Sequence, residues 1–186
     1  LNTAGELVLN VTDKTLQAGQ TYTVDFTAED FRSMLGYQFT LDFNTEAMSF
    51  VDVTAGELNS LSTANFGLTE VTSGSIVTSW NANSTRLEDG AVVFSLTFAA
   101  KQDGRLSDLL NVSSSQLANE AYAEQGVKRV ALRFNCETGS KLTGGEFALY
   151  QNEPNPFKSE TLIGFNLPEA TQGTLTIYDV SGKVIK

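Results

Sequence analysis

Oxygen-bearing side chains alternate along one short stretch of the chain and could bind a cation. Asp42, Asn44 and Glu46 stand at every second position, and Ca²⁺ takes carboxylate and carbonyl oxygens of this kind as ligands. The stretch lacks the glycine that the calcium-binding loop motif requires. A weak calcium site and a plain turn both remain open. The turn is favoured, and no cofactor is expected.

The residue types that most enzymes use for acid–base and nucleophilic chemistry are scarce. The chain has no histidine and a single cysteine, Cys136, which excludes Ser-His and Cys-His catalysis, histidine-ligated zinc and an internal disulfide bond. Its 22 acidic residues could supply the carboxylate pair of a small glycosidase, but a small sandwich leaves little room for a cleft. We therefore predict that the protein is not an enzyme.

The charge of the chain restricts its partners. The formal net charge is −10 and the isoelectric point is about 4.4. Nucleic acids and anionic membranes bind basic surfaces, and no apolar run reaches the length of a membrane-spanning helix. We expect no nucleic-acid partner and no membrane insertion.

Apolar and polar residues alternate with a period of two, which predicts strands with one apolar face. The apolar side of the clearest strands consists of Leu7, Leu9 and Val11; Tyr22, Val24 and Phe26; Tyr37, Phe39, Leu41 and Phe43; Ile76, Thr78 and Trp80; Phe94, Leu96 and Phe98; and Val130, Leu132 and Phe134. Glycine-containing turns separate these strands. The pattern predicts an all-β fold, a jelly-roll β-sandwich. Short helical turns are expected only within 106–110 and 114–123.

Polar side chains occupy the opposite side of two of these strands. Gln38, Thr40 and Asp42 alternate with apolar residues on one strand, and Ser95 and Thr97 do so on another. Such a face either receives a partner or is simply solvated, because one side of an antiparallel sheet can face water. We treat these five residues as a possible partner-binding face.

The amino-acid composition of the chain changes near position 135. Residues 136–146 are rich in glycine and poor in apolar residues, which is typical of a flexible linker. After them, about three short strands are expected in about forty residues, near the lower limit for an independent sheet. The predicted organisation is a β-sandwich over 1–135, a linker over 136–146 and a small module over 147–186.

The small module opens with a proline-rich stretch, continues to a strand ending in -LP- and closes on a -YD-x-x-G-K-V- strand and turn. The motif residues are Tyr150, Asn152, Pro154, Asn155, Pro156, Phe157, Pro168, Tyr178, Asp179, Gly182 and Lys183. In this order the segment resembles the first half of the C-terminal sorting domain of type IX secretion substrates. The resemblance implies a partial Ig-like β-sandwich that directs export across the outer membrane of certain Gram-negative bacteria and anchoring at the cell surface. The family's closing strands do not follow, so we expect an unpaired strand edge that a partner chain or the first unit covers.

A second resemblance covers residues 6–135. It rests on the stretch LGYQFTLDF at 35–43, MSF at 48–50, Ser79-Trp80, VFSLTFAAK at 93–101 and NEAY at 119–122. These stretches are similar to those of cohesin-like domains. That family is a jelly-roll β-sandwich whose members bind dockerin modules through one sheet face. The resemblance implies a dockerin-like partner for the polar face.

Together these observations predict a secreted, non-enzymatic binding or adhesion module at the bacterial cell surface, with a tail that engages the type IX export machinery. The alternative is a carbohydrate-binding module excised from a larger secreted glycan-degrading enzyme, with a glycan as ligand. A sugar binder usually presents exposed aromatic rings, and Trp80 could be one, but we assign Trp80 and most of the 12 phenylalanines to the core.

Overall fold

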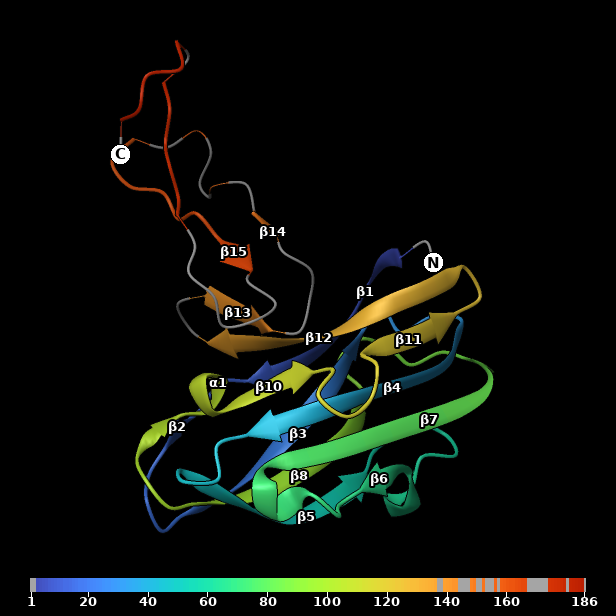
Figure 1. Ribbon diagram of the computed structural model, residues 1–186. Coiled ribbons are helices and arrows are strands. Elements are labelled where there is room, and N and C mark those ends of the chain that lie inside the picture. The colour runs from blue at the N-terminus through green and yellow to red at the C-terminus, as the bar shows by residue number, and fades with distance from the viewer. Residues whose placement is uncertain are drawn as a thin grey trace.

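The structure is a computed structural model (Figure 1) that describes residues 3–136, 139–143, 148–149, 152, 156, 158–166, 174–179 and 181–185. The elements are β1 (Thr3–Thr12), β2 (Thr15–Leu16), β3 (Thr21–Glu29), β4 (Met34–Phe43), β5 (Met48–Ala55), η1 (Thr63–Asn65), β6 (Phe66–Gly67), η2 (Val71–Ser73), β7 (Ser75–Thr85), β8 (Val92–Ala100), β9 (Gly104–Arg105), α1 (Leu106–Leu109), β10 (Leu110–Ser113), β11 (Glu120–Ala123), β12 (Gly126–Cys136), β13 (Gly139–Thr143), β14 (Ala148–Leu149) and β15 (Phe165–Asn166). Strands dominate, so the all-β prediction is confirmed.

One 11-stranded sheet contains most of the strands and curls over itself (Figure 1). Its path runs β5-β8-β3-β1-β12-β11-β4-β7-β6, with β10 added to β4 and β13 added to β12. Within this sheet β1 and β12 run parallel, and the other pairings are antiparallel. The strands β2 and β9 form a separate short pair.

The two ends of this path lie face to face around the core. The ring centroids of Phe39 on β4 and Phe94 on β8 are 6.5 Å apart, and those of Phe43 and Phe98 on the same two strands are 5.2 Å apart. Since β4 and β8 are not hydrogen-bonded neighbours, these contacts cross the core. We call β5, β8, β3 and β1 the β8 layer, and β10, β11, β4, β7 and β6 the β4 layer. The predicted jelly-roll β-sandwich is confirmed, and the outer sides of its two layers face in opposite directions.

The alternation in the sequence explains which side of each strand is buried. The residues predicted for the apolar sides are all buried except Tyr22, which packs against the core from its edge. Trp80 is 2% exposed, and its indole Nε1 donates a hydrogen bond to the carbonyl oxygen of Asn59 at 3.0 Å. Trp80 is therefore a core residue, as favoured, and no platform for a sugar.

One of the two expected helical turns is present, and the prediction of the other is wrong. The helix α1 lies at Leu106–Leu109, as predicted. Residues 114–119 instead form a loop, and Glu120–Ala123 form β11, which pairs with β4 and β12. Ala121 and Ala123 are buried on the inner side of β11, so sheet pairing and burial outweigh the helical preference of alanine.

Part of the segment predicted to be a flexible linker is a strand. β13 pairs antiparallel with β12, so that Thr143 lies opposite Leu132 and Gly139 lies opposite Cys136. The Lys141 ammonium donates a hydrogen bond to the carbonyl oxygen of Ser107 at 2.6 Å and lies 2.8 Å from the Asp108 carboxylate. The prediction of flexibility is thus corrected for 139–143, because these residues complete an edge of β12 that would otherwise be unpaired. The domain boundaries themselves stay predictions.

Beyond β13 the described residues form only small elements. β14 and β15 make a two-stranded sheet, and Tyr178 forms an isolated bridge with Val184. The exposed large apolar residues of this region are Leu149, Leu162, Phe165, Leu175, Ile177, Tyr178, Val184 and Ile185. The partial Ig-like module stays a prediction. Among the described residues, no helix is long and apolar enough to cross a membrane.

Candidate partner-binding face

The outer side of the β4 layer carries three of the five polar residues predicted for a partner. Gln38, Thr40 and Asp42 point away from the core, because the residues between them on β4 are buried on the inner side. In register, Gln38 lies between Ser79 of β7 and Glu120 of β11. We call this surface, the outer side of β4, β7, β10 and β11, the partner face.

Asp42 is the centre of a hydroxyl cluster on the partner face. Its carboxylate accepts hydrogen bonds of 2.5 Å from Ser75 of β7 and from Ser113 of β10, one on each oxygen. The hydroxyl of Ser115 lies 3.3 to 3.4 Å from the same carboxylate. The three hydroxyls hold the carboxylate in one orientation, so Asp42 is a fixed acceptor at the surface.

A glycine brings Ser75 to this position. Gly74 has φ of +94°, a conformation that other residues rarely adopt. A Cβ atom at Gly74 would lie 2.5 Å from the carbonyl oxygen of Phe43, while the Gly74 carbonyl accepts a hydrogen bond from the Phe43 N–H at 2.8 Å. Only glycine therefore allows β7 to start directly beside the end of β4, with Ser75 opposite Asp42.

Thr40 lies on the predicted side of β4 but is fully buried. Its hydroxyl oxygen accepts hydrogen bonds from the backbone N–H groups of Gln116 at 3.3 Å and Leu117 at 3.1 Å. The loop 114–119 between β10 and β11 therefore passes over Thr40. Thr40 holds this loop in place, and the loop rather than Thr40 forms that part of the surface.

Gln38 and its neighbours form the other end of the partner face. Gln38 is half-buried and Ser79 is exposed. The Tyr122 hydroxyl donates a hydrogen bond to the Glu120 carboxylate at 2.5 Å. This bond raises the pKa of Tyr122, so the phenol stays a donor that orients the carboxylate beside Gln38.

Ser95 and Thr97 lie on the other side of the molecule. Both belong to β8, where the Ser95 hydroxyl donates to the Asp25 carboxylate at 2.7 Å and the Thr97 hydroxyl lies 3.2 Å from that of Thr23. Because the outer sides of β4 and β8 face opposite directions, one partner surface cannot include both sets. The structure thus divides the predicted residues between two surfaces.

The alternating oxygens at the end of β4 form a turn. The Asn44 side-chain oxygen accepts hydrogen bonds from the backbone N–H groups of Glu46 at 2.9 Å and Ala47 at 3.2 Å, whereas Asp42 is bonded to serines. No group of three or more His, Cys, Asp or Glu side chains in the described part of the chain is placed to hold a metal ion. The plain turn is the arrangement present.

Several residues of the predicted sorting motif, namely Tyr150, Pro154, Asn155, Phe157 and Pro168, lie outside the described residues. Of the others, Pro156 is exposed and the Asn152 side chain donates a hydrogen bond to the Thr161 hydroxyl at 2.9 Å. Asp179 accepts hydrogen bonds from the Ser181 hydroxyl at 2.6 Å and from the backbone N–H groups of Ser181 and Lys183. These bonds lower the pKa of Asp179 and close the predicted turn, in which Gly182 has φ of +83°.

The sequence did not identify Ser75, Ser113 and Ser115 as neighbours of Asp42. Ser75 belongs to the alternating pattern of β7, but alternation does not indicate which strand pairs with which. β10 has only four residues, too few for a pattern, and Ser115 lies in a loop. All three are serines that lie on the outer side of the sandwich, which is the one feature of the sequence that could have indicated them.

One family model and several solved structures are similar to this chain. The model of the cohesin domain family matches residues 7–131. Similar solved structures include the seventh ScaB type I cohesin from Pseudobacteroides cellulosolvens, with 15% identity, a TM-score of 0.47 and coverage of 76% of this chain and 93% of that one. Another is a Coh-OlpA-Doc918 complex from Clostridium thermocellum, with 10% identity, a TM-score of 0.49 and coverage of 70% and 99%.

The solution structure of CaCohA2 from Clostridium acetobutylicum is similar too, with 14% identity, a TM-score of 0.48 and coverage of 73% of this chain and 84% of that one. A search of curated proteins gave no match. The family model spans well over half of the chain and contains the whole of β4, β7, β10 and β11. The chain therefore belongs to the cohesin domain family.

Proposed function

We propose that this chain is a non-enzymatic protein-binding module and that its partner face receives a dockerin-like module. Membership of the cohesin family is the observation that carries the proposal, because members of that family are binding modules for dockerins. The partner face is suited to docking a helix. It offers the fixed acceptor Asp42 on β4 and the exposed hydroxyl of Ser79 on β7, and the half-buried apolar Val77 lies on β7 between these two positions.

The proposal is tested by isothermal titration calorimetry of the full chain against a panel of purified dockerin modules. The test variant is Asp42→Ala and the matched control is Asp25→Ala, which removes a serine-bonded carboxylate from the opposite layer. We expect Asp42→Ala to weaken binding about tenfold or more, through loss of a buried charged hydrogen bond, and Asp25→Ala to leave it unchanged. Absence of binding to every dockerin tested, or equal effects of the two variants, would refute the proposal.

We infer further that residues 147–186 address the protein to the type IX export machinery, so that the binding module acts at the bacterial cell surface. The motif residues and the turn stabilised by Asp179 support this inference. The test compares secretion of the natural protein in a type IX-competent bacterium and in a strain that lacks the translocon. Equal amounts of protein outside the two strains would contradict the inference without affecting the dockerin proposal.

A further inference from the structure

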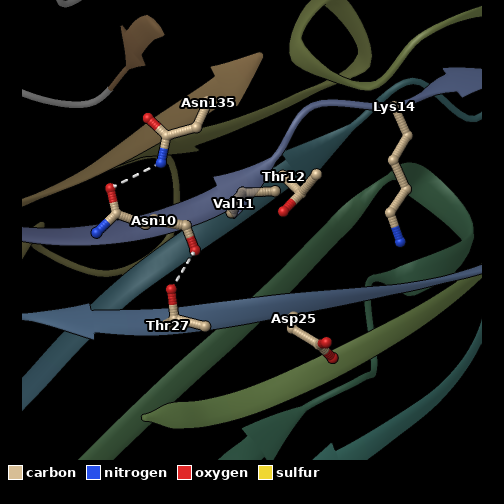
Figure 2. A pocket seen from close by; sticks show the side chains of 7 residues that line it. All are labelled: Asn10, Val11, Thr12, Lys14, Asp25, Thr27 and Asn135. Atoms are coloured by element: carbon tan, nitrogen blue, oxygen red, sulfur yellow. Dashed lines mark hydrogen bonds between the residues drawn. The ribbon is translucent and has the colours of Figure 1, made fainter. Parts of the chain in front are cut away.

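Figure 2 shows a polar hollow lined by residues of β1, β3 and β12. Because β1 and β3 belong to the β8 layer, the hollow lies away from the partner face. Its volume is about 150 Å³, enough for several water molecules or one sugar ring. The polar side chains that line it are Asn10, Thr12, Lys14, Asp25, Thr27 and Asn135. They come from β1 and the residue positions just after it, from β3 and from β12, three neighbouring parts of the curled sheet.

The amide side of the hollow is held rigidly. The Asn135 side chain donates a hydrogen bond to the Asn10 side-chain oxygen at 3.1 Å, and Asn10 donates in turn to the Glu29 carboxylate at 2.9 Å. Arg133 also pairs with this carboxylate. Hydrogen bonds from Arg133 and Asn10 lower the pKa of Glu29, so the acceptor that ends this chain of bonds stays ionised and fixes both amides.

The opposite side is held in the same way. Lys14 donates a hydrogen bond to the backbone carbonyl of Thr23 at 2.7 Å, and Asp25 accepts one from Ser95 at 2.7 Å. The Thr27 hydroxyl donates to the backbone carbonyl of Asn10 at 3.2 Å, as Figure 2 shows. Groups that are already oriented lose little conformational entropy when a ligand binds.

Each of these side chains keeps hydrogen-bonding capacity for a ligand. An ammonium has three donors, a carboxylate two oxygens and an amide two N–H groups and an oxygen. Among the described residues, one Asp25 oxygen, the Asn135 side-chain oxygen and the Thr12 hydroxyl have no hydrogen-bond partner. The hollow therefore offers donors and acceptors that the protein has oriented but not used.

The charges of the hollow decide which ligand fits. One ammonium, Lys14, and one carboxylate, Asp25, line it, and their formal charges sum to zero. A cation would be repelled by Lys14 and an anion by Asp25. A neutral molecule with neighbouring hydroxyls can donate to the carboxylate and accept from the ammonium and amides. We propose that the hollow binds one sugar unit of a neutral glycan, independently of the partner that binds the partner face. No aromatic ring lines it, so the affinity comes from hydrogen bonds and is in the millimolar range.

The test is NMR titration of the full chain with cellohexaose, xylohexaose and mannohexaose, with polygalacturonate as a charged comparison. We expect a neutral oligosaccharide to shift the backbone amides of Asn10 and Thr12 and the side-chain amide of Asn135. Loss of one charged hydrogen bond should weaken this binding about tenfold in Asp25→Ala and in Lys14→Met. Asp42→Ala on the partner face should leave it unchanged.

The proposal is overturned if none of the neutral oligosaccharides shifts these amides, if polygalacturonate binds more tightly, or if Asp42→Ala weakens binding as much as Asp25→Ala. Asp25 is exposed, so its replacement should not affect folding, and unchanged amide spectra away from the hollow verify this. Dockerin binding depends on Asp42 and glycan binding on Asp25. The failure of either proposal can therefore be told from failure of the other.

Discussion

The hydroxyl of Thr40 accepts a hydrogen bond from the backbone N–H of Leu117 at 3.1 Å, across 77 positions of the sequence. This bond and the one from Gln116 attach the loop 114–119 to the centre of the partner face. Thr40, predicted to contact a partner, is thus buried and positions the loop that forms this part of the surface.

Replacing Thr40 by valine should loosen this loop. The substitution keeps the shape but leaves two backbone N–H groups without their acceptor, which costs about 1 to 3 kcal/mol. Amide hydrogen exchange should become faster at Gln116 and Leu117 while the core strands keep their protection. Thr27→Val is the control, since the Thr27 hydroxyl is a donor on the other layer. Unchanged exchange at both amides of Thr40→Val would contradict the assignment.

Acid should remove a stabilising contribution of Asp13. Burial opposes ionisation of this carboxyl, but hydrogen bonds from Arg105 and from Ser107 outweigh it and lower its pKa below the ordinary value of 3.8. Because the pKa is lower in the folded protein, the contribution is complete above the unfolded value and is lost as the pH falls through the folded one. Asp13→Asn should therefore lower the free energy of unfolding at pH 7 and flatten its acid dependence below about pH 4.

The expected loss for Asp13→Asn is about 1 kcal/mol, because the Asp13 side chain is only 4% exposed whereas its partner Arg105 is 50% exposed and partly screened. Urea unfolding over a series of pH values measures it. The control Asp30→Asn removes an ion pair whose members are both largely exposed and should change little. Parallel acid profiles for the wild type and Asp13→Asn would show that Asp13 does not contribute.

Two tyrosine-to-phenylalanine changes should have opposite effects. Tyr37 is buried against Thr78, and neither hydroxyl has a hydrogen-bond partner in the described part of the chain. Burial raises the pKa of the Tyr37 phenol, with a smaller opposing effect of the nearby Thr78 hydroxyl. Tyr37→Phe removes a desolvated polar group and should leave stability unchanged or raise it by about 1 kcal/mol.

Tyr122→Phe loses the hydrogen bond to Glu120 and should lower stability by about 0.5 to 1.5 kcal/mol. Thermal and urea unfolding of both variants give the comparison. A clear destabilisation by Tyr37→Phe would reveal a hydrogen bond that the buried phenol makes after all.

Lys141 should hold β13 against the sandwich. Its contacts with Ser107 and Asp108 join β13 to α1. Lys141→Met should speed amide exchange within β13, and the cost should be below about 1 kcal/mol because both members of the ion pair are substantially exposed. The pairing of β1 with β12 should not change. Lys128→Met, on β12 itself, is the control, and equal effects of the two variants would count against a role for Lys141.

The sequence predicted which side of each strand is buried, because alternation with a period of two follows directly from strand geometry. It therefore placed Gln38 and Asp42 on the side of β4 that faces away from the core, where both are half-buried. It could not show that Ser95 lies on the opposite layer, since alternation identifies a side of a strand and not the layer to which the strand belongs.

Other features depend on contacts between residues far apart in the sequence. The burial of Thr40 depends on a loop without periodicity. The strand β11, within the segment 114–123 where a helical turn was expected, forms by pairing with β4, which is distant in the sequence. The strand character of β13 was hidden by the glycines of the surrounding segment 136–146, which are typical of linkers. β13 nevertheless pairs with the edge of β12, the strand directly before it in the chain.

The parallel pairing of β1 with β12 has a mechanical consequence. β1 begins at Thr3 and β12 ends at Cys136, and these are opposite ends of the paired strands; β13 then runs back along β12 to Thr143. Once β13 has separated from β12, tension applied at Thr3 and at Cys136 would therefore pull the two strands past one another along their length. The hydrogen bonds between β1 and β12 would then be loaded together instead of breaking one after another.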